Sequence, residues 1–255
     1  MTAITVDLNS DIGESFGLYQ MGQDEEVLKF ISSANIACGY HAGDHNVMNK
    51  TVKLAVERGV AIGAHPGLPD LAGFGRRFID VTPDDVYNMV IYQVSGLQGF
   101  VQIHGDSLHH VKPHGALFHM ATKDPIIAKA VATAVYDCDP SLILYGLTGS
   151  ELVLAGKNKG LRVAEEVFAD RTYQPDGRLT PRSDPHAIID DRDEAMSRVL
   201  RMVTQGMVTA VDGTDIPIKA DTICVHGDES QALEFVKGLR QLFIEHTISV
   251  KAVSH

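Results

Sequence analysis

Short apolar segments alternate with longer amphipathic segments along almost the whole chain, and this alternation constrains the fold more than any other feature. The short segments have the length of buried strands, and the longer ones have the length and boundary residues of helices. Repeated strand–helix units indicate parallel strands with helices packed outside them. The expected strands are residues 4–8, 34–38, 60–64, 110–112, 142–145, 162–167 and 222–225.

Several helix boundaries can be predicted from capping residues. Asp44 is suited to cap a helix that Gly59 ends, and Thr82-Pro83-Asp84-Asp85 combines a capping hydroxyl, a proline at the first position and an acid at the third. Asp212-Gly213 indicates a hairpin turn. The other expected helices are residues 24–31, 124–136, 151–158, 191–205 and 231–246, and residues 248–253 are either an eighth strand or a tail.

The length of 255 residues fits one domain over residues 1–255, without an internal linker. A closed α/β barrel of the (β/α) type, with seven or eight strands, accounts best for the repeated units. A doubly wound open sheet is the alternative, since both folds alternate strands and helices.

Composition narrows the partners and the compartment. The formal net charge of −11 disfavours nucleic acid. No segment approaches the roughly 18 apolar residues of a membrane span, and no secretory signal precedes the first strand. Three widely spaced cysteines, an odd number, indicate a reducing compartment. We therefore expect a cytoplasmic protein without a membrane or nucleic-acid partner.

Polar clusters follow nearly every expected strand. Because (β/α) barrels keep their chemistry at the carboxyl ends of the strands, clusters at that position predict an active site. Glycines flank most of them, which suits close approach of the backbone to a ligand. The clusters are residues 9–14, 38–45, 63–67, 112–115, 165–171 and 226–228.

Asp11, His65, Lys112 and His114 are the expected catalytic residues. Asp11 has the chemistry of a general base or a metal ligand, and His65 ends a strand where it should point inward. Lys112, between Val111 and Pro113, is expected to hold an anion or a developing oxyanion. His114 follows on the same face two positions later.

The remaining clusters supply substrate-binding and metal-binding candidates. His41 and His45 have metal-binding HxxxH spacing, although a cap at Asp44 would leave His41 outside the helix. Glu165 and Glu166 point to opposite faces, so only one of them can face the barrel interior. The expected substrate contacts are Asn9, Glu14, His41, Glu165, His226 and Asp228, and the candidate metal ligands are Asp11, His41, His45 and His65.

Other catalytic patterns are missing from the sequence. It contains no phosphate-binding P-loop, no G-x-G-x-x-G after a strand and no G-x-S-x-G elbow. Cys38, beside Gly39 and His41, is interpreted as a buried apolar residue rather than a nucleophile.

Six stretches resemble the LamB/YcsF family. They are LNSDIGESFG (8–17), SANIACGYHAGD (33–44), GAHPGLPDLAGFGRR (63–77), VKPHGALF (111–118), AEEVFADRTY (164–173) with Gly177-Arg178-Leu179, and CVHGD (224–228). They span most of the chain in order. Phe118 stands where the family is expected to have tyrosine, a departure that we expect to leave the site unaffected.

The resemblance implies a seven-stranded barrel of the glycoside hydrolase/deacetylase type. It implies the A subunit of an ATP-dependent 5-oxoprolinase, which opens the lactam of 5-oxo-L-proline to L-glutamate together with subunits B and C. ATP is then the implied cofactor, bound here or through the partners, and Arg76 or Arg77 is a candidate for closing over an anion. Two alternatives stay open: a metal-dependent deacetylase or amidohydrolase, and a non-catalytic subunit that binds a small ligand.

Overall fold

The computed structural model describes residues 4–226 and 232–254. Within them, seven parallel strands close into a barrel, because β1 pairs with β2 on one side and with β9 on the other. This closure confirms the expected barrel and excludes the open sheet. The barrel strands are β1 (Thr5–Ile12), β2 (Ser33–Ala37), β3 (Ala61–His65), β4 (His110–Val111), β5 (Ile143–Leu147), β6 (Arg162–Phe168) and β9 (Thr222–His226).

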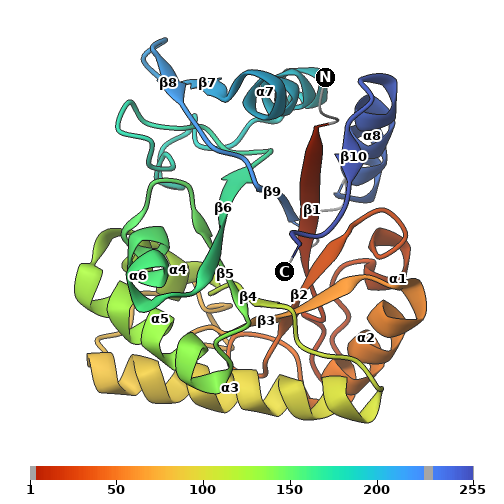
Figure 1. The fold of residues 1–255 in the computed structure, drawn as a ribbon, viewed down its shortest axis with the longest axis vertical. Helices are drawn as coiled ribbons and strands as arrows, with labels where there is room; N and C mark the ends of the chain where they lie inside the picture. The colour runs from red at the N-terminus through yellow and green to blue at the C-terminus, as the bar shows by residue number, and fades with distance from the viewer. Residues whose placement is uncertain (1–3, 227–231, 255) are drawn as a thin grey trace.

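Helices surround this barrel on its outer side (Figure 1). Their apolar faces pack on the outward residues of the strands, such as Leu8, Ile36 and Ile62, all of which are buried. The helices are α1 (Asp24–Val27), α2 (His45–Arg58), α3 (Pro83–Ile103), α4 (Gly115–Lys123), α5 (Pro125–Cys138), α6 (Glu151–Lys159), α7 (Arg192–Gln205) and α8 (Ala232–Glu245).

The predicted helix boundaries are confirmed where capping residues define them. Asp44 accepts hydrogen bonds from the backbone N–H groups of Asn46 and Val47, and Gly59 ends α2 with a left-handed φ of 65°. Thr82 and Asp85 form a reciprocal capping box at the start of α3. Helix α4, which follows His114 directly, was not expected from the sequence.

The C-terminal segments differ in their roles. Strands β7 (Met207–Thr209) and β8 (Asp215–Pro217) form the expected hairpin around Asp212-Gly213. Strand β10 (Ser249–Val250) pairs with the first residues of β1, outside the closed ring. Beyond β10, the carbonyl of Val253 lies 2.9 Å from His109 Nε2, and Val253 packs against the buried Tyr145 cluster. The chain end therefore lies at the amino end of the strands, opposite the polar loops.

Polar side chains fill much of the barrel interior. Asp7, Asn9 and Asp11 alternate in β1 with the outward Val6, Leu8 and Ile12, and all six are buried. Strand β1 thus runs four residues beyond the expected end at Leu8, and its inward face is entirely polar. Barrel interiors more often hold branched apolar side chains. Buried polar side chains need hydrogen-bond partners. In this barrel, the network of hydrogen bonds among them extends to the carboxyl ends of the strands.

Candidate active site

A buried network of charges lies in the barrel under the carboxyl ends of the strands. Lys112 Nζ is 2.9 Å from Asp11 Oδ1, 2.9 Å from Glu166 Oε1 and 2.9 Å from Cys224 Sγ. Asn9 accepts a longer bond of 3.3 Å from the same ammonium group. This network therefore sets one cation against two carboxylates, a set that is tolerable inside a protein because the ammonium group contacts both of them.

Pairing controls the charge states of this network. Burial disfavours the charged form of Lys112, but Asp11, Cys224 and Glu166 raise the pKa of this ammonium well above its usual value. Burial raises the pKa of Glu166, although Lys112 partly counteracts it. Asn35 donates to Asp11 Oδ1 at 2.8 Å and to Asn9 Oδ1 at 2.7 Å. Asp11 is thus held by two donors, an ammonium and an amide.

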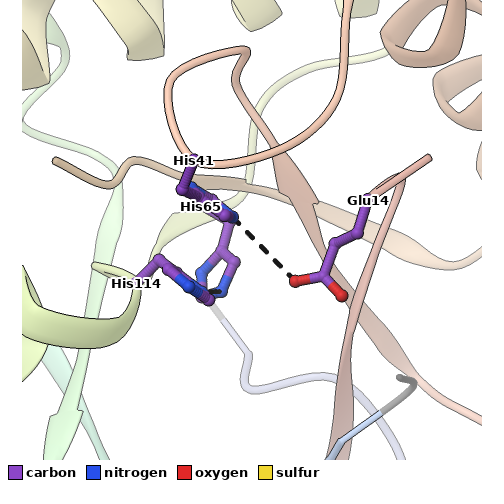
Figure 2. Close-up of side chains that lie close together, drawn as sticks. All are labelled: Glu14, His41, His65 and His114. Atoms are coloured by element: carbon purple, nitrogen blue, oxygen red, sulfur yellow. Dashed lines mark hydrogen bonds and ion pairs between the residues drawn. The ribbon is translucent and has the colours of Figure 1, made fainter. Parts of the chain in front are cut away.

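Four further side chains converge on one another (Figure 2). Glu14 follows β1, His41 lies in the loop after β2, His65 ends β3, and His114 stands at the start of α4. One potential ligand atom from each lies within 4.8 Å of the others, and all four residues are buried. His65 Nε2 is also 3.3 Å from Asp11 Oδ2, so the histidines connect to the charge network.

Two of the histidines in this cluster are poor bases. Burial, followed by the nearby His114 and His65, places the pKa of His41 well below its ordinary value. Burial and His65 act in the same direction on the pKa of His114. The His41 and His114 rings stack with centroids 3.6 Å apart and planes 3° apart. These two rings therefore offer neutral nitrogen lone pairs near neutral pH.

Close backbone packing makes room for the buried imidazoles. A Cβ on Gly67 would lie 2.5 Å from His41 Nδ1, and a Cβ on Gly63 would lie 2.1 Å from His110 Nε2. Neither glycine has a positive φ, so the requirement here is space for an imidazole rather than backbone conformation. The glycine-rich clusters in the sequence are thus explained in part by the histidines that pack on them.

A cavity of about 280 Å³ opens over this network at the carboxyl ends of the strands. Asp11, His65, Lys112 and His114 form part of its wall, so all four expected catalytic residues are brought together. Among the residues that line it within the described chain, Asp11 is the only acid. The basic residues of the wall, histidines aside, are Arg76, Lys112, Lys123, Arg171, Arg178 and Arg182.

The expected substrate contacts meet different outcomes. Asn9, Glu14 and His41 are buried next to the catalytic set but are not among the residues of the cavity wall. Asn9 instead donates to Glu166 at 3.1 Å and Thr222 at 2.7 Å. The position of the His226 side chain and the whole of Asp228 lie outside the described residues, although the backbone of His226 ends β9.

Glu165 is a correction to the sequence prediction. Its carboxylate faces away from the barrel interior, where it bonds to Lys157 at 2.9 Å and to Thr148 at 3.0 Å, and it is not part of the cavity wall. The inward position belongs to Glu166, which contacts Lys112. Both orientations satisfy the alternation of a strand, and the sequence did not identify which glutamate turns inward.

Lys112 and His45 are also placed differently from expectation. From the sequence, we expect Lys112 to hold an anion or a developing oxyanion. In this structure its ammonium group is instead paired with the carboxylates of Asp11 and Glu166. His45 begins α2 with an exposed side chain and does not join the other histidines. The HxxxH spacing fails because Asp44 caps the helix between the two residues.

Arg76 and Arg171 both belong to the cavity wall but differ in their surroundings. Arg76 is exposed and lies with its guanidinium carbon 4.9 Å from the centre of the Phe74 ring. Arg77 is instead paired with the buried Asp70 and is not part of the cavity wall. Arg171 is buried, bonds to the carbonyls of Thr180 and Ala187, and has its pKa lowered to about 10 by burial. Arg171 lies in one of the polar clusters of the sequence, residues 165–171, without a predicted role of its own.

Two smaller expectations concern Cys38 and Phe118. Burial raises the pKa of the Cys38 thiol to about 12, so it stays protonated and is a poor nucleophile, as expected. Phe118 lines the cavity and packs edge-on against Phe168, with ring centroids 5.9 Å apart. The departure from tyrosine at this position therefore lies in the wall of the site.

Comparison with known proteins identifies close relatives over nearly the full chain. The LamB/YcsF family model matches residues 6–255. A protein from Oceanobacillus iheyensis that is named as the A subunit of 5-oxoprolinase is 60% identical over 246 residues, which are 96% of each chain. Another protein of the same name, from Halalkalibacterium halodurans, is 60% identical and covers 98% of this chain and 97% of its own.

The fold is shared with a solved structure. The lactam utilization protein from Thermus thermophilus superposes with a TM-score of 0.94 at 44% identity, covering 98% of this chain and 100% of that one. No helix in the described part of the chain has the length and apolar character needed to cross a membrane.

Proposed function

The chain belongs to the LamB/YcsF family, and we propose that it is the A subunit of an ATP-dependent 5-oxoprolinase. In this proposal it opens the five-membered lactam of 5-oxo-L-proline to give L-glutamate, in a complex with subunits B and C. The relatives that carry the 5-oxoprolinase name support this assignment over 96–98% of the chain. The word subunit in their names supports a complex of several chains.

The observation that carries the proposal is the charge of the cavity wall. The chain has a net charge of −11, yet the described cavity wall carries four arginines and two lysines against one acid, Asp11. Lys112 is paired with Asp11 and Glu166, and Arg178 is paired with Asp176. The charge that attracts an anion therefore comes from the other basic residues of the wall, which are Arg76, Lys123, Arg171 and Arg182. Such a local excess of cations in an acidic protein attracts and orients a small anion. 5-Oxoproline carries one carboxylate on a compact ring, which suits a cavity of about 280 Å³.

Asp11 is the proposed general base. Its Oδ1 is fixed by Lys112 and Asn35, which favour the ionised carboxylate, and its Oδ2 is 3.3 Å from His65 Nε2. A carboxylate held in this way can take a proton from water as the oxygen attacks the lactam carbonyl carbon. Lys112 acts through Asp11 as a positioning residue, and His65 and His114 orient the water or the leaving nitrogen.

ATP coupling addresses the low reactivity of the lactam. An amide is stabilised by resonance, and phosphorylation of its oxygen would create a far better electrophile. Because the sequence has no P-loop or other recognised nucleotide motif, we assign ATP activation to the complex with subunits B and C. Coupling to ATP and a chain whose cysteines are all free fit a cytoplasmic location.

Reconstitution tests this function. Glutamate release from 5-oxo-L-proline is measured with this chain, the two partner subunits and ATP, and then with each component omitted in turn. We expect glutamate only in the complete mixture. Absence of glutamate when all three chains are folded and assembled would refute the assignment.

A further inference from the structure

In the cluster of Glu14, His41, His65 and His114, no placement of hydrogens alone gives every imidazole nitrogen a hydrogen-bond partner among the described residues. Carbonyl oxygens only accept, so each imidazole nitrogen beside a carbonyl must carry the hydrogen. His65 Nδ1 lies 2.7 Å from the carbonyl of Lys112, and His114 Nε2 lies 2.8 Å from the carbonyl of Phe74. Both rings are therefore anchored as donors to the backbone.

This anchoring fixes the tautomers of the two rings when both are neutral. The remaining nitrogens, His65 Nε2 and His114 Nδ1, must then both be lone-pair acceptors, yet they face each other at 2.9 Å. Two lone pairs at this distance repel unless a positive centre lies between or beside them. Donation of the distal N–H to a backbone carbonyl is also the usual way in which proteins orient metal-binding histidines.

His41 and Glu14 identify the positive centre. Among the described residues, neither ring nitrogen of the buried His41 has a hydrogen-bond partner, and its Nε2 lies 3.9 Å from Glu14 Oε1. An added proton between His65 and His114 would leave the nitrogens of His41 unsatisfied. A cation reached by all four side chains would satisfy His41 as well as the facing lone pairs.

We propose that Glu14, His41, His65 and His114 bind one divalent transition-metal ion of the Zn²⁺ or Co²⁺ class. The donor set of three imidazoles and one carboxylate suits these ions, whereas Mg²⁺ and Ca²⁺ prefer oxygen ligands. The site is thus distinct in chemistry from any magnesium that accompanies ATP. The inference rests on the four side chains alone and does not depend on the proposed substrate.

The His41 ring must rotate before one ion can contact all four side chains. A metal lies close to the plane of each imidazole that binds it, but the His41 and His114 planes are stacked, only 3° apart. His41 therefore rotates about its Cβ–Cγ bond on binding, a torsion with a broad energy minimum. His65 and His114 keep their orientation through their bonds to the backbone.

The four side chains lie next to the cavity and to Asp11, where a bound ion could take part in hydrolysis. His65 and His114 belong to the cavity wall, and Asp11 Oδ2 lies 3.3 Å from His65 Nε2. A bound divalent ion lowers the pKa of coordinated water and polarises a carbonyl oxygen. Asp11 is well placed to accept the proton that such a water releases.

The test uses metal alone and needs no substrate. Untagged full-length protein is stripped with a chelator and titrated with Co²⁺, while visible absorption and calorimetry report the bound ion. We expect one equivalent to bind with a d–d absorption spectrum of nitrogen and oxygen ligands. Because loss of an outer-shell partner alone weakens binding about 10–100-fold, His41→Gln and Glu14→Gln should raise the Kd at least about 100-fold.

Three further variants separate ligand loss from other effects. His45→Gln removes a histidine four positions from His41 but outside the cluster, and it should leave the Kd unchanged. Gly67→Ala keeps all four ligands but places a Cβ 2.5 Å from His41 Nδ1, so it should weaken Co²⁺ binding at least about tenfold, the lower end of the outer-shell range. Gly99→Ala, in α3, meets no atom within 4 Å and should bind as wild type.

Circular dichroism and thermal unfolding confirm that each variant is folded before it is titrated. The proposal is overturned if stripped wild-type protein takes up no Co²⁺ or Zn²⁺ in a saturable manner. It is equally overturned if folded His41→Gln, Glu14→Gln and His45→Gln proteins all bind as wild type does.

Discussion

Lys112 Nζ and Asp11 Oδ1 lie 2.9 Å apart in the barrel interior, where Lys112 is 2% exposed and Asp11 is 7% exposed. Glu166 shares the same ammonium at 2.9 Å. This relationship explains why the lysine at the end of β4 is buried in a barrel otherwise rich in carboxylates and amides. Asp11, the one acid of the described cavity wall, is held in place by this ammonium group.

Lys112→Met should destabilise the fold as well as the site. Without the ammonium, Asp11 and Glu166 become buried carboxylates with no cationic partner, and breaking a buried pair in this way costs about 3–5 kcal/mol. Urea unfolding followed by circular dichroism measures the change. Lys112→Met/Glu166→Gln should recover part of the lost stability, since the amide removes one of the two charges. Unchanged stability in Lys112→Met would contradict the assigned pairing.

Arg76 and Arg77 offer a matched pair for the anion-binding role of the cavity. Arg76→Gln removes a cation from the cavity wall and should raise the KM for 5-oxoproline about tenfold, which corresponds to about 1.4 kcal/mol. Arg77→Gln removes the neighbouring charge, which is paired with Asp70 outside the wall, and should leave KM unchanged. Steady-state kinetics of the reconstituted complex distinguish the two, and equal KM values for both variants would remove Arg76 from the site.

The sequence allowed the barrel to be predicted because its determinants are local. The positions of the seven barrel strands, the caps at Asp44 and Thr82 and the turn at Asp212-Gly213 each depend on a few adjacent residues, and they match the structure, although β1 runs four residues beyond its expected end. The same polar clusters led to Asp11, His65, Lys112 and His114, which line one cavity. Parallel strands with polar residues at the same end are enough to predict that convergence.

The contacts between the clusters could not be predicted in the same way. The choice between Glu165 and Glu166 depends on how β6 is oriented against its neighbours, a property that one strand does not encode. The polar inward face of β1 could have been recognised, since Asp7, Asn9 and Asp11 stand at every second position and Val6, Leu8 and Ile12 stand between or beside them. The pairing of Lys112 with two carboxylates could not be predicted, because it depends on distances between separate strands of the barrel.

The pH dependence of stability should report on the buried His110. Burial, followed by the nearby His109 and Lys112, places the pKa of His110 well below its ordinary value, and Nε2 lies 2.8 Å from Asn35 Oδ1. In the unfolded chain this histidine takes up a proton near a pH of about 6.5, whereas in the folded chain it stays neutral. The unfolded state therefore binds more protons below that pH, and stability falls as pH falls from about 6.5 toward the folded pKa.

His110→Gln provides the measurement of this effect. One proton of difference corresponds to a slope of about 1.4 kcal/mol per pH unit, so the variant's stability should fall less steeply with decreasing pH by up to that amount. Urea unfolding between about pH 6.5 and the onset of acid unfolding gives the slopes. His246→Gln, at an exposed position directly after α8, is the control and should keep the wild-type slope. A wild-type slope in His110→Gln would show that His110 does not contribute.

Asp11→Asn in the reconstituted complex tests the central claim most directly, with ADP and glutamate measured in the same reaction and Asp80→Asn, at an exposed loop position, as the control. The proposal predicts that ADP still forms when 5-oxoproline is added, because activation depends on the partners, while glutamate release falls about 10²–10⁴-fold. Glutamate release at the wild-type rate from Asp11→Asn would contradict the claim that this carboxylate opens the lactam.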